Sequence, residues 1–166
     1  MRIFLIGMPG SGKTTNGKAL ADVLDVPFDD LDEKIEIREG DKISQIFEKE
    51  GEEYFRKIEH LELIQLIGSE TNCVISTGGG TPCFHGNMQL MKASGITVYL
   101  KTTLDVLLSR LEGSQHRPLL QSTELEKKLK NLLDTRAHFY QEADITIDGN
   151  DIEIERLVQL INSTKN

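Results

Sequence analysis

The chain has 166 residues, of which 38% are hydrophobic and 28% are charged, and its formal net charge is -8. This length suits one compact domain spanning residues 1–166 and is too short for two of ordinary size. Apolar residues come in short clusters, whereas a membrane helix needs a run of about 18 or more. Lys and Arg form no block of the kind that binds nucleic-acid phosphates. We therefore expect a cytoplasmic protein with no membrane partner and no nucleic-acid partner.

Short apolar runs rich in β-branched residues alternate with helical patterns along the chain. The predicted strands cover residues 2–6, 26–30, 73–76, 96–101 and 144–148. Such alternation is typical of βαβ units around a parallel sheet with helices on both faces. The sequence therefore predicts an α/β domain with a five-stranded parallel sheet.

The strongest motif, Gly7-Met8-Pro9-Gly10-Ser11-Gly12-Lys13-Thr14, directly follows the first predicted strand. It matches the pattern G-x-x-x-x-G-K-[ST] and precedes a run compatible with a helix. Its glycines let backbone N–H groups converge on phosphate oxygens, and the helix start adds unpaired donors. Lys13 can reach the β- and γ-phosphates, and the Thr14 hydroxyl suits a largely hydrated Mg²⁺. No Asn-Lys pair of the guanine-reading kind occurs, so we expect ATP.

Two aspartates, Asp30 and Asp32, follow at the end of the second predicted strand, where open α/β sheets bind their ligands. Residues two apart on an extended chain share a face, so both carboxylates are predicted to point the same way. One could face hydrated Mg²⁺ and the other a substrate hydroxyl. The alternative is a solvated acidic turn in which an aspartate caps the next helix.

Residues 51–68 are predicted to form a long amphipathic helix. Its predicted buried stripe, with spacing i, i+4, i+7 and i+11, consists of Tyr54, Ile58, Leu61 and Gln65. Arg56 lies away from this stripe. Taken alone it is best interpreted as a surface arginine, because charged helix residues are mostly solvated.

Three consecutive glycines, at residues 78–80, follow the third predicted strand. Lacking Cβ atoms, they expose backbone donors and let a ligand approach closely, although a flexible connection is the alternative. Arg136 lies in a later helical pattern and, like Arg56, is taken alone as a surface arginine.

Several residues indicate where the later helices begin. Thr102 or Thr103 can cap the helix after the fourth strand. Thr123 with Glu126 forms a capping-box pattern for the next helix, and Asn150 is predicted to cap the last one. Between the first two of these helices, residues 113–121 are polar and contain Gly and Pro, which predicts a mobile lid loop. Arg117 in this loop could swing onto a nucleotide as the site closes.

In order and spacing, the chain resembles the shikimate kinases over nearly its whole length. The resemblance rests on the phosphate loop and on five further motifs: Asp30-Leu31-Asp32, Phe55-Arg56-Lys57-Ile58-Glu59, Gly78-Gly79-Gly80, Arg117-Pro118-Leu119-Leu120 and Arg136-Ala137-x-x-Tyr140. It implies a three-layer P-loop kinase fold, related to nucleoside monophosphate kinases. It also implies transfer of the ATP γ-phosphoryl group to the 3-hydroxyl of shikimate, in chorismate and aromatic amino acid biosynthesis. The expected protein is a monomer that uses ATP, shikimate and Mg²⁺.

The same resemblance implies a role for each matched residue. The catalytic residues would be Lys13, Asp32 and Arg117, with Asp32 hydrogen-bonded to the acceptor hydroxyl. Mg²⁺ would be held by Thr14 and, through water, by Asp30. The residues expected to bind ATP are Gly10, Ser11, Gly12, Lys13, Thr14, Thr15, Arg110 and Arg117, with Arg110 near the adenine. The residues expected to bind shikimate are Asp32, Arg56, Gly79 and Arg136.

Two other functions stay open on the sequence. A gluconate or nucleoside monophosphate kinase would share the fold, but a monophosphate acceptor favours an arginine-rich lid, and residues 113–121 contain only Arg117. The second alternative is a nucleotide-binding regulatory module without turnover. The presence of Lys13, Asp32 and Arg117 argues against it. The turn at residues 148–151 also lacks the proline that often frames adenine in the family.

Overall fold

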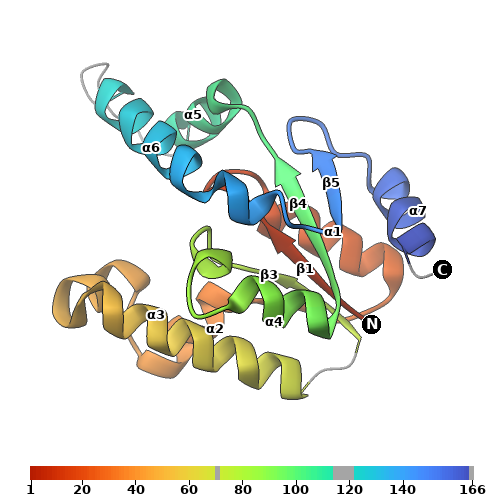
Figure 1. Ribbon diagram of the computed structural model, residues 1–166, viewed down its shortest axis with the longest axis horizontal. Helices are drawn as coiled ribbons and strands as arrows, with labels where there is room; N and C mark the ends of the chain where they lie inside the picture. The colour runs from red at the N-terminus through yellow and green to blue at the C-terminus, as the bar shows by residue number, and fades with distance from the viewer. Residues whose placement is uncertain (70–71, 114–121, 165–166) are drawn as a thin grey trace.

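Five parallel strands form one sheet at the centre of the protein (Figure 1). The computed structural model describes residues 1–69, 72–113 and 122–164. The strands are β1 Arg2–Ile6, β2 Phe28–Asp30, β3 Cys73–Ser76, β4 Ile96–Lys101 and β5 Ile145–Asp148, in the order β2-β3-β1-β4-β5 across the sheet. The helices are α1 Lys13–Leu24, α2 Leu31–Glu39, α3 Ile43–Ser69, α4 Asn87–Ser94, α5 Leu104–Gly113, α6 Ser122–Tyr140 and α7 Ile154–Thr164, with a 3-10 turn η1 at Thr81–Cys83. This architecture confirms the predicted fold class.

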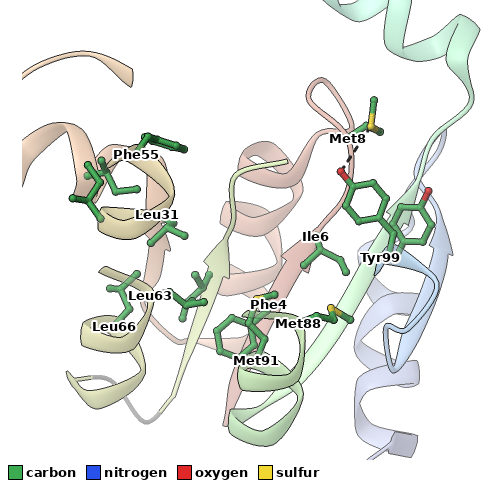
Figure 2. Close-up of a cluster of buried hydrophobic side chains, with 14 of the residues drawn as sticks. Phe4, Ile6, Met8, Leu31, Phe55, Leu63, Leu66, Met88, Met91 and Tyr99 are labelled. Atoms are coloured by element: carbon green, nitrogen blue, oxygen red, sulfur yellow. Dashed lines mark hydrogen bonds between the residues drawn. The ribbon is translucent and has the colours of Figure 1, made fainter. Parts of the chain in front are cut away.

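Alternate residues of the central strand β1 face two separate cores. Phe4 and Ile6 pack with residues of α2 to α6, including Met88 and Met91 of α4 (Figure 2). Ile3 and Leu5 pack on the other face with residues of α1 and α7. Burying each such side chain contributes about 1.5–3 kcal/mol, so β1 is held firmly between two layers of helices. The phosphate loop therefore begins from a fixed strand.

The helices and strands begin close to the predicted positions, with one informative difference at β2. The strand starts at Phe28 and not at Val26. Two residues before the strand, Asp25 and Val26, instead complete the end of α1. Asp25 adopts φ 53°, and the N–H of Val26 donates to the carbonyl of Ala21 at 3.1 Å. This arrangement satisfies the last carbonyls of α1, and it delays the strand.

The predicted buried stripe of the long helix is wrong except at Ile58. Tyr54 and Leu61 are 37% and 43% exposed, and Gln65 is exposed. The buried face of α3 instead consists of Ile46, Phe55, Arg56, Ile58, Glu59, Glu62, Leu63 and Leu66. This face is partly charged because α3 packs against α2 and η1, where it also lines a polar site. None of the described helices has the length and apolarity needed to cross a membrane.

Two capping predictions are also wrong. Thr123 lies inside α6, which begins at Ser122. Asn150 precedes the start of α7 by four residues, and its side-chain oxygen accepts from the N–H and the hydroxyl of Thr103 at 3.0 and 3.2 Å. Asn150 therefore fixes the chain entering α5. The predicted lid beyond Gly113, including Arg117, lies outside the described residues.

Candidate active site

The phosphate loop joins the carboxyl end of β1 to α1 and forms a preorganised anion cradle. Gly7, Gly10 and Gly12 adopt φ angles of 145°, 81° and 88°, which side chains with a Cβ rarely allow. Since α1 begins at Lys13, the N–H groups of its first turn lack helical partners at this loop. The positive end of the helix dipole adds to this attraction, so the loop is suited to bind phosphates.

Lys13 lies buried beneath the loop, with its ammonium group donating to the carbonyls of Gly7 and Met8 at 3.0 Å each. Burial lowers the pKa of Lys13 to about 8, while the nearby charges of Asp32 and Asp30 raise it. The amine therefore keeps most of its charge at pH 7. One cation thus lies within electrostatic reach of both carboxylates predicted from the sequence.

Thr14 and Asp30 meet next to the phosphate loop. The hydroxyl of Thr14 donates to Oδ2 of Asp30 at 2.7 Å and lies 3.4 Å from Oγ of Ser76. Oxygen donors of this kind suit Mg²⁺, which takes few protein ligands and keeps several waters alongside phosphates. Among the described residues, no three His, Cys, Asp or Glu side chains gather as metal ligands. The donors at this site fit a hydrated Mg²⁺ held mainly by nucleotide phosphates.

The two aspartates are brought together, but not along an extended chain as predicted. Asp32 lies in the first turn of α2, and Asp30 caps that helix, accepting from the N–H groups of Asp32 and Glu33 at 3.0 and 3.4 Å. Asp30 is buried and bonded to Thr14, so a merely solvated turn is wrong as well. The capping part of that alternative is correct.

Burial, together with the charges of Asp30 and Glu59, raises the pKa of the Asp32 carboxyl to about 6, while the charge of Lys13 opposes this rise. The group is ionised at pH 7 but is a much stronger base than an ordinary aspartate. A general base works best when its pKa lies near the working pH. Asp32 therefore has the protonation behaviour expected of a residue that accepts a proton.

The three glycines at residues 78–80 form a close wall of this site. A Cβ at the first would lie 3.0 Å from Asp32 Oδ1 and 2.9 Å from Glu59 Oε1. A Cβ at the second would lie 3.2 Å from Nη1 of Arg136, and one at the third would lie 2.5 Å from Nη2 of Arg56. The run thus brings its backbone against four charged side chains, which a merely flexible connection would not do.

Arg56 is a buried residue and not the surface arginine that its isolated position suggested. Its side chain is 9% exposed and donates to Oε2 of Glu59 at 2.8 Å and to Oε1 of Glu52 at 3.2 Å. A buried guanidinium with a fixed carboxylate partner is preorganised for a second anion, because its planar fork can bind a carboxylate through two parallel hydrogen bonds.

Arg136 projects from α6 toward the same wall. Tyr140, one turn later, is fully buried and its hydroxyl donates to the carbonyl of Gly79 at 2.5 Å. Burial raises the pKa of the Tyr140 phenol, so the group stays a donor. Arg136, Tyr140 and Gly79 therefore connect α6 to the glycine run, and Arg56 and Arg136 border it from α3 and α6.

Arg110 of α5 lies at the outer side of the phosphate loop. Its guanidinium donates to the carbonyls of Gly10 and Ser11 at 3.4 and 3.3 Å, and to the carbonyl of Asn150 at 3.1 Å. The turn that departs from the family pattern therefore lies beside the arginine expected near the adenine.

Glu59, for which the sequence indicated no role, lies between Arg56 and the glycine run. Its carboxylate is fully buried and bridges Arg56 to Thr81, accepting from the Thr81 hydroxyl at 2.6 Å. The sequence could have indicated this ion pair, because Glu59 follows Arg56 by three residues and residues at this spacing are neighbours on a helix.

Comparisons with known proteins agree with the resemblance. The sequence model of the family described as shikimate kinase matches residues 9–164. A shikimate kinase of Aquifex aeolicus (strain VF5) is 44% identical over 149 residues, covering 90% of this chain and 87% of the relative. A shikimate kinase of Azobacteroides pseudotrichonymphae is 49% identical over 148 residues, covering 87% of each chain.

Solved structures show the same similarity. A crystal structure of shikimate kinase from Bacteroides thetaiotaomicron has a TM-score of 0.90 and 41% identity, covering 98% of both chains. Shikimate kinase from Acinetobacter baumannii, in complex with shikimate, has a TM-score of 0.88 and 40% identity over 99% of this chain and 94% of that one. A gluconokinase from Sinorhizobium meliloti, at 16% identity and a TM-score of 0.56, shares the fold alone.

Proposed function

The chain belongs to the shikimate kinase family, and we propose that it transfers the γ-phosphoryl group of ATP to the 3-hydroxyl of shikimate. The products are ADP and shikimate 3-phosphate. The observation that carries the assignment is the site itself, in which Asp32 lies near the buried Lys13 of the phosphate loop and beside a glycine run bordered by Arg56 and Arg136.

The nucleotide side of the site is the phosphate loop. Backbone N–H groups of residues 10–15 would bind the phosphates, and Lys13 would stabilise the charge that develops on the transferring group. Arg110, fixed between the loop and the carbonyl of Asn150, would border the adenine. The assignment of Arg117 to the phosphates rests on the family resemblance.

The acceptor side is the glycine wall with Arg56 and Arg136. Shikimate carries a carboxylate and hydroxyl groups, and two arginines flanking the wall can bind the carboxylate. Asp32, which lies beside the first glycine of the same run, would then accept a hydrogen bond from the 3-hydroxyl. As the hydroxyl oxygen bonds to the γ-phosphorus, the bond to the bridging oxygen breaks, ADP departs and the proton passes to Asp32.

Thr14, and Asp30 through water, would hold Mg²⁺. When bound, the ion would neutralise part of the charge on the nucleotide phosphates. The hydrogen bond between the two residues already places their oxygens together beside the loop. We further propose that the protein is a cytoplasmic monomer.

The test is turnover with a panel of acceptors. The protein is incubated with Mg-ATP and with shikimate, quinate, gluconate or AMP, while ADP release is followed. Shikimate should be preferred by at least a hundredfold in kcat/KM, and Asp32→Asn should abolish most of that rate. Comparable rates with gluconate or AMP would contradict the acceptor assignment, and ATP binding without turnover would favour a regulatory module.

A further inference from the structure

An aromatic ring from outside α3 lies against the guanidinium of Arg56. The Cζ atom of Arg56 is 4.3 Å from the ring centroid of Phe84, compared with 5.1 Å for Phe55 and 5.8 Å for Phe47. All three lie within the range of a cation–π interaction, and Phe84 is the nearest. Phe55 and Phe47 belong to α3 itself, whereas Phe84 follows η1.

The hydrogen bonds of Arg56 leave part of its fork available. An arginine has five N–H donors. Bonds to described partners use Nε and Nη2 toward Glu52 and Nη1 toward Glu59. This leaves one N–H on each terminal nitrogen without a described partner, and two such N–H groups can bind a carboxylate through two hydrogen bonds. Glu52 is exposed and Glu59 is buried, so Glu59 is the firmer of the two carboxylate partners. A ring against the face of the guanidinium adds a second restraint on the plane of the fork.

The segment that carries Phe84 is attached to α3 on both sides of the ring. Before it, the Thr81 hydroxyl donates to Glu59 at 2.6 Å. After it, Nδ1 of His60 donates to the side-chain oxygen of Asn87 at 2.6 Å, because the amide nitrogen of Asn87 donates to the carbonyl of Thr81 at 3.0 Å. The ring is therefore held against Arg56 by a braced turn and is not a loosely placed surface side chain.

We propose that Phe84 is a positioning residue for the acceptor carboxylate. Its ring fixes the plane of the Arg56 guanidinium so that the two remaining N–H groups face the carboxylate together. The role rests on the proposed function of Arg56 in binding shikimate. It predicts that Phe84 acts on acceptors through their carboxylate only.

The experiment compares Phe84→Leu with Phe84→Tyr. Leucine fills much of the space without a π face, whereas tyrosine keeps the face. We expect Phe84→Leu to raise KM for shikimate by about fivefold to twentyfold, with kcat and KM for ATP within about twofold. Phe84→Tyr should stay near the wild type. The neutral alcohol analogue, in which CH₂OH replaces the carboxylate, should lose no affinity in either variant.

The matched control is Phe28→Leu, which removes a ring from beneath Lys18 at 5.7 Å, outside the acceptor side. It should leave KM for shikimate unchanged. The proposal would be overturned if Phe84→Leu and the wild type had equal KM values for shikimate. It would also be overturned if Phe84→Leu lost as much affinity for the alcohol analogue as for shikimate. If Phe84→Leu does not fold, Phe84→Met is measured in its place, and unfolding of both would assign Phe84 a structural role instead.

Arg56→Lys separates this proposal from the one it rests on. A loss of shikimate affinity in Arg56→Lys without a loss in Phe84→Leu would refute the positioning role alone. An unchanged KM for shikimate in Arg56→Lys would refute the carboxylate assignment itself.

Discussion

Replacing Asp32 with asparagine should make the protein more stable at neutral pH while removing its activity. The Asp32 carboxyl is buried beside Asp30 and Glu59, and these surroundings raise its pKa from an ordinary 3.8 to about 6. A raised pKa means that the folded protein prefers the protonated acid. The contribution of this group to stability is therefore fully present below about pH 4 and is lost as the pH rises through about 6.

The size of the effect follows from the two pKa values. One pKa unit corresponds to about 1.4 kcal/mol, so the difference between 3.8 and about 6 amounts to about 3 kcal/mol at pH 8. For a domain of this length, 1 kcal/mol shifts Tm by about 2–4 °C. Since asparagine does not titrate, the variant should gain about 6–12 °C on the wild type between pH 4 and pH 8.

The assays are urea unfolding, which measures the free-energy difference, and thermal unfolding, which measures Tm, for the wild type and Asp32→Asn at several pH values from 4 to 8, without ligands. The control is Glu33→Gln, which removes an exposed carboxylate from the same turn of α2, and the gain in stability with pH should be larger for Asp32→Asn than for this variant. A difference between Asp32→Asn and the wild type that does not grow with pH would refute the account of the Asp32 environment. Turnover of Asp32→Asn should fall by about a hundredfold or more.

Three further substitutions test single contacts. Asp30→Asn should raise the Mg²⁺ concentration needed for half-maximal turnover several-fold, and excess metal should restore the rate. The cap of α2 should survive, because asparagine caps a helix about as well as aspartate. A defect in turnover that no metal concentration relieves would contradict the assignment. Arg136→Lys should raise KM for shikimate about tenfold with KM for ATP unchanged, because an ammonium group lacks the planar fork. If calorimetry shows that the affinities for shikimate and ATP fall equally, Arg136 does not bind the shikimate carboxylate specifically. Gly80→Ala places a Cβ 2.5–2.8 Å from the Arg56 guanidinium and should lower kcat/KM for shikimate at least tenfold. The control Gly68→Ala has open space around its Cβ and should leave the kinetics unchanged. Similar rates in the two variants would contradict a close contact between the glycine run and Arg56.

The strands and the phosphate loop could be predicted because local signals determine them. Apart from β2, the strands are short, largely apolar runs between polar breakers, and the loop carries its glycines at fixed spacing before a helix. The edge strand β2 began late because Asp25 and Val26 complete the end of α1. That cap depends on a left-handed aspartate, which sequence patterns indicate only weakly.

The face of α3 that is buried could not be predicted from hydrophobicity. Arg56 and Glu59 lie on that face because they neutralise each other and line a polar site, so an apolar stripe gave the wrong register. The role of Asn150 could not be predicted either, because its hydrogen-bond partner Thr103 is 47 residues away in the sequence. Contacts between distant segments determine these placements, and only the resemblance to a family suggested that Arg56 had a role.

The most direct test of the account is the position of the phosphate on the product. Shikimate is incubated with the wild type and Mg-ATP, and the product is examined by phosphorus–proton correlation NMR. With the carboxylate bound by Arg56 and Arg136 and the acceptor hydroxyl at Asp32, the phosphorus should couple to the proton on carbon 3. A phosphate on another hydroxyl, or no transfer to shikimate, would contradict the proposed arrangement of the site.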